Sequence, residues 1–373
     1  MYLDMKRQLF ALLAIAAIPY CVASEPVAIP AFIDVSSNKI EGDIPRFRHG
    51  LERLGDSADT VIHIVHIGDS HIQAEFVTCR LRALLQERYG DAGRGLTVPL
   101  RLAGTNQSHD FSYALTSGTD APSPVQTRLL KFPWPLHPGF TGIAVQYPEA
   151  QTVTFSVPGH KFDRMKIYTS SGERELTLAP TDSATFGIDA GETLYGTFTT
   201  NGHPGVVYSA IGNNGACFTD YSLIDGFPKS VAALHPDLLI LSMGTNEGFS
   251  TMTDEEIRRS VRNLIRSLQA NSPGSEILVL APMECQKNRN HGSKPLSPYF
   301  DINTRVAEAR AIIVDEARNC GVAVWDFYPI AGGEGASAHW LDAGLMNKDR
   351  IHLLRPGYEL EAQLLYDALT KSE

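Results

Sequence analysis

Apolar and polar positions follow two different patterns along this chain. Near both ends, continuous apolar runs alternate with stretches in which apolar residues return every three or four positions. The runs predict buried strands, and the wider spacing predicts amphipathic helices. Strand-like runs cover residues 61–65, 237–243, 276–281 and 322–327; helical spacing covers residues 72–85, 253–268, 306–317 and 356–369. This alternation is typical of an α/β domain whose parallel sheet is covered on both faces.

The middle of the chain has a different period. Between about Leu102 and Pro204, short segments of alternating apolar and polar residues replace the helical spacing, as in residues 152–156 and 164–168. Such segments, separated by Gly, Pro, Asp and Ser, predict antiparallel strands. A loop of about 100 residues would be unusually long for a compact fold. We therefore expect a β-sandwich module at residues 104–204, inserted into a discontinuous α/β domain of residues 25–103 and 205–373.

The first 24 residues have the layout of a secretory signal peptide. Lys6 and Arg7 precede an apolar stretch from Leu9 to Val22, and small residues lead to a cleavage site after Ser24. The apolar stretch is short for a membrane span, so a retained anchor is the less favoured interpretation. The sequence predicts an exported protein, periplasmic or extracellular, with no membrane span in the mature chain.

Composition and charge narrow the class of partner. Apolar residues make up 43% of the chain and charged residues 20%, which are ordinary values for a globular protein. Cleavage after Ser24 removes Lys6, Arg7 and Asp4, so the formal net charge changes from −10 to −11. An acidic protein is a poor partner for nucleic acid or anionic membranes. A neutral or mixed-charge polysaccharide remains compatible with this charge.

Four cysteines follow the predicted cleavage site: Cys79, Cys217, Cys285 and Cys320. Export permits disulfides, and four cysteines allow three pairings among which the sequence does not choose. None forms a C-x-x-C pair, which argues against a zinc cluster. We interpret them as small buried residues with at most one bridge among them.

Candidate chemistry centres on Ser70. It follows an apolar strand in the turn Gly68-Asp69-Ser70 and opens a helix, where free N–H groups favour developing negative charge. A serine nucleophile needs a base, and His352 is suitable because its ordinary pKa is close to neutral. Asp349, three residues earlier, can hold the far ring nitrogen. Asn246 follows another strand, so its amide can point into the cleft at the strand ends.

These segments resemble the four sequence blocks of the SGNH (GDSL-type) hydrolases. The matches are Gly68-Asp69-Ser70, Gly215 within residues 211–216, Gly244-Thr245-Asn246, and Asp349 with His352. The resemblance implies a flavodoxin-like, three-layer α/β/α fold, with Ser70 as nucleophile, His352 as base and Asp349 as its partner. It implies an oxyanion hole made by the N–H groups of Ser70 and Gly215 and the side chain of Asn246. Gly212 is the alternative to Gly215.

A narrower resemblance is to bacterial peptidoglycan O-acetylesterases. It is carried by His71 directly after the serine and by three segments at residues 89–95, 244–247 and 343–346. The resemblance implies an exported esterase with a β-sandwich similar to a carbohydrate-binding module between the serine and glycine blocks. The implied substrate is an acetylated polysaccharide, above all peptidoglycan with O-acetylated muramic acid. No metal and no organic cofactor is implied.

Other functions remain open at this point. The same triad would serve an O-acetyltransferase, in which a sugar hydroxyl replaces water. An esterase for acetyl-xylan, pectin or lipid is a second alternative. A non-catalytic glycan-binding protein is the third, although a pure binder has no need of a complete Ser-His-Asp set.

Three further residues stand near these motifs. We interpret Arg94 as a loop anchor rather than a substrate contact. His71 is expected either at the cleft mouth or on a helix surface. We interpret Trp134, Trp325 and Trp340 as core or packing residues. Trp340 is the best alternative candidate for a sugar platform, because it lies in an expected loop that leads to Asp349.

Overall fold

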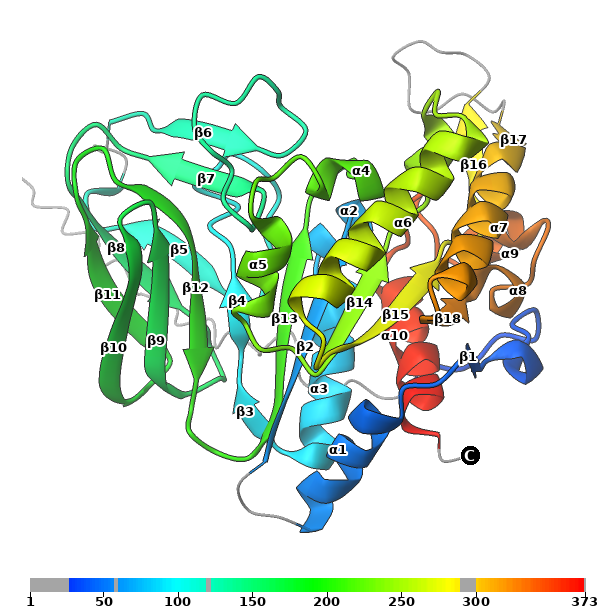
Figure 1. The fold of residues 1–373 in the computed structure, drawn as a ribbon, viewed down its shortest axis with the longest axis horizontal. Helices are drawn as coiled ribbons and strands as arrows, with labels where there is room; N and C mark the ends of the chain where they lie inside the picture. The colour runs from blue at the N-terminus through cyan, green and yellow to red at the C-terminus, as the bar shows by residue number, and fades with distance from the viewer. Residues whose placement is uncertain (1–26, 57–59, 119–121, 289–299, 372–373) are drawn as a thin grey trace, which may run out of the picture.

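The computed structural model describes residues 27–56, 60–118, 122–288 and 300–371, so the predicted signal peptide lies outside the described residues. A seven-stranded sheet forms the centre of the molecule (Figure 1). In spatial order its strands are β1 (Ile40–Glu41), β18 (Ala323–Asp326), β15 (Glu276–Ala281), β14 (Leu238–Ser242), β2 (Val61–Gly68), β13 (Gly205–Gly212) and β3 (Asp91–Gly93). Only β1, at one edge, runs antiparallel to its neighbour in this sheet.

Helices cover both faces of this sheet. One face packs against α1 (Pro45–Asp56), α2 (Ser70–Gln73), α3 (Phe76–Tyr89), α8 (Phe327–Ile330), α9 (Ala336–Asp342) and α10 (Arg355–Thr370). The other face packs against α4 (Phe218–Tyr221), α5 (Phe227–Ala232), α6 (Asp254–Asn271) and α7 (Thr304–Asn319). The result is the three-layer α/β/α arrangement that the apolar pattern predicts.

Strand β14 shows why continuous apolar runs form this sheet. Its side chains alternate between the faces: Leu238 and Ile240 belong to one core, and Leu239 and Leu241 to the other. All four are fully buried. A strand buried on both faces gains apolar contacts at every position, so its sequence is continuously apolar rather than alternating.

Antiparallel strands form a β-sandwich beside the sheet (Figure 1). One layer contains β4 (Gly95–Thr97), β6 (Val125–Arg128), β7 (Ile143–Gln146), β9 (Phe162–Thr169), β10 (Gly172–Thr181) and β12 (Thr193–Thr200). The other contains β5 (Ser112–Leu115), β8 (Gln151–Ser156) and β11 (Ser183–Ile188). The inward side chains of both layers form a core of their own, with Phe155 and Ile167 fully buried in it.

The predicted fold class is therefore confirmed: a parallel-sheet α/β/α domain with an inserted β-sandwich. β4 already pairs with β12, so the antiparallel module includes a strand that precedes residue 104. The module is also fixed to the domain by packing. Leu129, from the turn after β6, is buried in the core between the sheet and helices α4 to α7, and Trp134 packs against that core.

The segment after Ser70 differs from the single helix that the apolar spacing suggests. It consists of the short α2 and the longer α3, separated by Ala74 and Glu75. Glu75 has a left-handed backbone with φ of 56°. Its carboxylate is buried and paired with Arg94, a partner that helical spacing cannot reveal.

Smaller elements complete the fold. Within the described residues, the 3-10 turns η1 (Val35–Ser37) and η3 (Glu247–Phe249) and a hairpin of β16 (Gln286–Asn288) and β17 (Phe300–Ile302) lie outside the central sheet and the β-sandwich. Within the described parts of the chain, no helix combines the length and apolar character of a membrane span.

The cysteines follow the prediction only in part. Cys217, Cys285 and Cys320 are buried free thiols. Cys79 is therefore paired with none of these three, and the bridge that we allowed among the four cysteines is absent. Burial raises the pKa of the Cys285 thiol to about 12, so this thiol stays protonated at neutral pH.

Candidate active site

Ser70 lies where β2 passes into α2. Asp69 is the N-cap of that helix, and its carboxylate accepts a hydrogen bond from the His71 N–H at 2.9 Å. Ser70 is the first helical residue, and within the described residues its own N–H has no hydrogen-bond acceptor. The strand end therefore presents a hydroxyl and a free N–H at the same point.

His352 brings its imidazole to this hydroxyl from the other end of the chain. Its Nε2 lies 2.8 Å from the Ser70 Oγ, although the two residues are 282 positions apart. Its Nδ1 lies 2.8 Å from the Oδ2 of Asp349. Because the carboxylate accepts from Nδ1, the free lone pair is on Nε2, where it can accept the serine proton.

Asp349 is itself fixed by its own turn. Its Oδ1 accepts hydrogen bonds from the backbone N–H groups of Ile351 at 2.9 Å and His352 at 3.0 Å. Partial burial raises the pKa of Asp349, but the His352 side chain and these N–H groups outweigh burial and leave the pKa below its ordinary value. The hydrogen bond to Asp349 raises the pKa of His352 above 6.5, in spite of the opposing effect of burial. The Asp349 carboxylate is thus placed to stabilise a positive charge on His352.

Gly215 and Asn246 lie in the same cleft as Ser70 and His352. The Gly215 backbone is left-handed, with φ of 84°, and its N–H has no acceptor within the described residues. Gly212 packs instead on the backbone of α2, where a Cβ would come within 2.1 Å of the Gln73 nitrogen. Of the two glycines considered from the sequence, Gly215 is the one that faces the cleft.

The Asn246 side chain is oriented by two acceptors. Its Nδ2 lies 3.1 Å from the Asp69 Oδ2 and 3.1 Å from the Ala216 carbonyl oxygen. Burial raises the pKa of Asp69 to about 7, against the lowering effect of the His71 N–H and of His352. Next to Asn246, the buried Glu247 accepts from the Phe218 N–H at 2.8 Å and so ties this turn to α4.

Gln73 links three segments around the site, and the sequence analysis missed it. Its Oε1 accepts from the Asn214 N–H at 2.9 Å, directly before Gly215. Its Nε2 donates to the Asn106 Oδ1 at 2.7 Å and to the Thr105 Oγ1 at 3.0 Å. Gln73 is buried and sits on the same short helix as Ser70. No local pattern predicts this role, because the partner at Asn214 is 141 residues away.

His71 lies in neither of the places expected for it. It is half-buried beside His352, with the two ring centroids 5.1 Å apart, and its Nδ1 lies 2.9 Å from the Tyr358 hydroxyl. Burial lowers the pKa of His71 to about 3. A neutral His71 adds no positive charge beside the imidazolium of His352.

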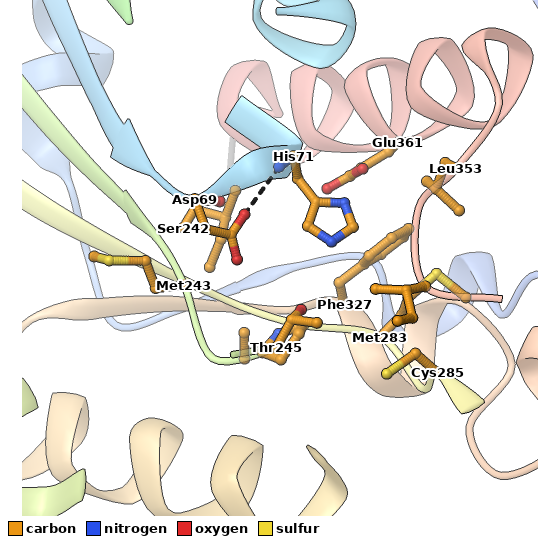
Figure 2. Close-up of a pocket in the computed structure, with 14 residues that line it drawn as sticks. Asp69, His71, Ser242, Met243, Thr245, Met283, Cys285, Phe327, Leu353 and Glu361 are labelled. Carbon is orange, nitrogen blue, oxygen red and sulfur yellow. Dashed lines mark hydrogen bonds between the residues drawn. The ribbon is translucent and has the colours of Figure 1, made fainter. Parts of the chain in front are cut away.

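A small cavity of about 50 Å³ lies on the inner side of this turn. Figure 2 shows Asp69 and His71 beside it, with Glu361 of α10 approaching the His71 ring. The cavity shares Thr245 and Leu353 with the main cleft. Burial raises the pKa of Glu361 to about 8, so this carboxyl is largely neutral at pH 7.

The main cleft is larger, with a volume of about 550 Å³. Polar side chains of Asn106 and Asn214 line it together with apolar side chains of Phe76 and Phe249. A mixed lining of this kind, beside a serine, a histidine and two unpaired N–H groups, is suited to acyl transfer on a polar substrate.

Trp340 and Arg94 are both buried and away from the cleft lining. Trp340 is fully buried in helix α9, and its Nε1 donates to the Ala331 carbonyl at 2.9 Å, so the sugar-platform interpretation is wrong. Arg94 is fully buried between Glu75 and Asp110, as an anchor should be. Within the described residues, no group of three or more His, Cys, Asp or Glu side chains is placed to hold a metal ion.

Comparisons with known proteins agree with this geometry. The model of the GDSL-like Lipase/Acylhydrolase family matches residues 182–360, which include Gly215, Asn246, Asp349 and His352. This part of the chain belongs to the SGNH (GDSL-type) hydrolases. The matched region does not include Ser70, and the contact with His352 is what joins this serine to the family's other blocks. The protein is accordingly an esterase enzyme.

Solved structures show the same fold. A peptidoglycan O-acetylesterase superposes with a TM-score of 0.72 at 21% identity, covering 88% of this chain and 97% of that one. Two others cover less than half of this chain. A lipase/acylhydrolase from Enterococcus faecalis has a TM-score of 0.33 at 18% identity, covering 44% of this chain and 76% of that one. An acetyl xylan esterase has a TM-score of 0.34 at 17% identity, covering 44% of this chain and 81% of that one. No curated protein matches the sequence.

Proposed function

We propose that this esterase removes O-acetyl groups from a polysaccharide, and that the polysaccharide is peptidoglycan. The observation that carries the proposal is the continuous chain of contacts from Asp349 through His352 to Ser70, with both links 2.8 Å long, at the edge of an open cleft. A triad in this geometry supports nucleophilic acyl transfer.

In the first step, the Ser70 Oγ attacks the carbonyl carbon of the acetyl ester while His352 Nε2 takes the hydroxyl proton. The carbonyl oxygen becomes an oxyanion, for which the N–H groups of Ser70 and Gly215 and the amide of Asn246 are the proposed donors. The tetrahedral species then collapses. His352 returns the proton to the departing sugar oxygen, which leaves as a free hydroxyl, and the acetyl group remains on Ser70.

In the second step, water attacks the acetyl carbonyl carbon and gives one proton to His352 Nε2. Collapse breaks the bond to Ser70 Oγ, which recovers the proton, and acetic acid leaves as acetate at neutral pH. Asp349 keeps its charge throughout and compensates the imidazolium in both steps. None of these steps draws on a group outside the chain other than substrate and water.

The choice of substrate rests on two considerations. The solved peptidoglycan O-acetylesterase has the same fold over 88% of this chain. The cleft is open, and Asn106, Asn214 and Asn347 in its lining offer hydrogen-bonding groups for a sugar beside the apolar side chains of Phe76 and Phe249.

The place of action follows from the same proposal. Residues 1–24 have the composition of a signal peptide, and peptidoglycan lies outside the cytoplasmic membrane. We therefore place the mature enzyme in the periplasm or outside the cell. Sequencing the N-terminus of the exported protein tests this, with Glu25 expected as the first residue.

Acetate release from O-acetylated sacculi is the direct test of the function. The wild-type enzyme should release acetate, and Ser70→Ala should lower the rate by several orders of magnitude. Acetylated xylan and a long-chain ester serve as competing substrates in parallel reactions. Faster release from either of these, or undiminished release by Ser70→Ala, would contradict the proposal.

A further inference from the structure

We propose that a second cavity beside the active-site cleft is a carboxylate-binding subsite, formed by Arg128 and Lys131 of the β-sandwich. The inference rests on the proposed polysaccharide deacetylation and makes it more specific. It assigns the substrate to the acidic sugar polymers, and it gives the inserted module a direct part in substrate selection.

The cavity lies between the module and the loop that carries Gly215. Its volume is about 70 Å³, and Asn214 lines both this cavity and the main cleft. Leu130, in the turn between Arg128 and Lys131, is the nearest neighbour of Gly215: a Cβ built there would lie 3.8 Å from it. A ligand group in this cavity is therefore adjacent to the reacting ester.

The turn that carries the two cations is rigidly placed. The Lys131 N–H donates to the Arg128 carbonyl at 2.9 Å, and the Trp134 Nε1 donates to the Leu129 carbonyl at 2.9 Å. Leu129 is buried in the core of the catalytic domain. The turn thus moves with the catalytic domain rather than with a flexible linker.

The module also supports the Gly215 loop from the other side. The Asn213 side chain is buried and donates to the Thr141 carbonyl at 3.0 Å. The two walls of the cavity, one from the module and one from the catalytic domain, are therefore held at a fixed separation.

The charge of this cavity differs from that of the whole chain. The protein carries a formal net charge of −10, yet two cations and no carboxylate line the cavity. Arg128 uses one Nη1 hydrogen on the Gly104 carbonyl at 3.2 Å. Among the described residues, neither Arg128 nor Lys131 has an acidic partner, so both charges remain available to a ligand.

An anionic group with two or more acceptor oxygens fits this arrangement. Arginine and lysine bind carboxylates through charge-assisted hydrogen bonds. Muramic acid carries a free carboxylate on its lactyl ether where no peptide is attached. Where a peptide is attached, the lactyl carboxyl is part of the amide bond and the carboxylates are those of the peptide. Xylan backbones are neutral and would leave the two cations unsatisfied.

The test compares substrates that differ only in charge. The double variant Arg128→Gln/Lys131→Gln is assayed on O-acetylated sacculi and on the same sacculi after their carboxyls are converted to neutral amides. We expect kcat/KM on the acidic sacculi to fall roughly tenfold more than on the neutral ones, the size expected for two partly exposed charge contacts. The difference should shrink at high salt.

The matched control is Lys161→Gln/Arg164→Gln, which also removes one lysine and one arginine charge. These residues lie in β9 and just before it, in a part of the module distant from β6 (Figure 1). We expect this control to match the wild type on both substrates. Equal losses by the Arg128/Lys131 variant on acidic and neutral sacculi, or no loss on acidic sacculi, would overturn the subsite.

Two further experiments identify the source of the carboxylate and test the peptidoglycan proposal separately from the Arg128/Lys131 subsite. An amidase removes the peptide carboxylates and frees the lactyl carboxylate of the same muramic acid. If the charge effect survives this treatment, a lactyl carboxylate is able to fill the subsite; if it disappears, the peptides supply the ligand. Should the wild type fail on sacculi but deacetylate O-acetylated galacturonan in an Arg128- and Lys131-dependent way, the peptidoglycan proposal falls and the subsite stands. If the wild type is active on sacculi and the charge of the substrate has no effect, the peptidoglycan proposal stands and the subsite falls.

Discussion

The side-chain amide of Asn246 donates a hydrogen bond to the carboxylate of Asp69, with the two atoms 3.1 Å apart. The same nitrogen lies 3.1 Å from the Ala216 carbonyl oxygen, so both of its hydrogens have acceptors. Since both partners are acceptors, the orientation of the amide is unambiguous. The consequence is that Asn246 is held in place before substrate arrives, and that an oxyanion must share or replace one of these two hydrogen bonds.

Replacing Asn246 with alanine removes one proposed oxyanion donor while leaving the triad untouched. We expect Asn246→Ala to lower kcat by roughly 10²–10³, as for the loss of a single donor, with a smaller change in KM. Steady-state hydrolysis of p-nitrophenyl acetate measures both constants. A kcat within a factor of two of the wild type would mean that the amide serves only to tie the turns together.

The extent to which the sequence predicts this molecule depends on how local the determining interactions are. The strand β14 and the helix α6, with its capping box at Thr253 and Glu256, follow from apolar spacing and from residues three positions apart. The order of strands in the β-sandwich depends on pairing between distant segments, as between β4 and β12, which periodicity does not encode.

The candidate site also combines residues that local motifs predict with residues whose partners are distant in the sequence. Ser70, Asp349 and His352 are found from the sequence because each lies in a short motif with a known chemical use. Gln73 and Arg94 act through partners far away in the chain, and nothing near them in the sequence marks the contact. The loop expected around Trp340 is instead the short helix α9, because its buried contacts come from segments that local spacing does not reveal.

The pH dependence of the reaction should report the His352–Asp349 pair. The imidazole must be unprotonated to accept the serine proton, and its hydrogen bond to Asp349 raises its pKa above 6.5. We therefore expect kcat/KM to rise with pH through a value above 6.5 and then reach a plateau. Asp349→Asn removes the stabilising charge, so the rising limb should move to lower pH while the rate falls by on the order of 10²–10⁴.

Asp69 is the group in contact with the Asn246 side chain that titrates in a similar range, because burial raises its pKa to about 7. Burial also raises the pKa of Glu247 to about 7 and that of Glu361 to about 8. His71 does not contribute, since burial lowers its pKa to about 3. Asp69→Asn serves as the control: it should keep a rising limb above pH 6.5 if His352 is responsible. A limb that disappears in Asp69→Asn and stays fixed in Asp349→Asn would assign it to Asp69 instead.

Gln73 is expected to act on the reaction through the position of Gly215. Its Oε1 holds the Asn214 N–H at 2.9 Å, so Gln73→Ala frees the loop that carries the proposed oxyanion donor. We expect kcat to fall about 10–100-fold with little change in KM, since small displacements of catalytic groups have effects of this size. Gln73→Glu keeps the acceptor for Asn214 and should recover part of kcat.

To separate an effect of Gln73 on the position of Gly215 from an effect on stability, kcat is measured on Gln73→Ala enzyme that is shown to be folded. If Gln73→Ala lowers the melting temperature but its folded fraction turns over at the wild-type rate, Gln73 has a structural role only. The loss of kcat should also be similar on p-nitrophenyl acetate and on acetylated glycan, because both reactions use the same oxyanion donors.

Arg94 should contribute to stability rather than to turnover. Its guanidinium is fully buried, pairs with Glu75, and lies 2.6 Å from the Asp110 Oδ2 through Nε. Burial alone would raise the pKa of Asp110, but Arg94 and Arg82 reverse this and hold it well below its ordinary value. Arg94→Met removes one of two cations from two buried carboxylates, so we expect a loss of about 3–5 kcal/mol in the free energy of unfolding.

Urea denaturation at pH 7 measures this loss, with Arg318→Met as the matched control. Arg318 pairs with Glu41 across an exposed surface, where ion pairs contribute little. Lowering the pH should narrow the difference between Arg94→Met and the wild type, because protonation neutralises the carboxylates that Arg94 compensates. An Arg94→Met protein as stable as the Arg318→Met control would show that Arg82 alone satisfies both buried acids.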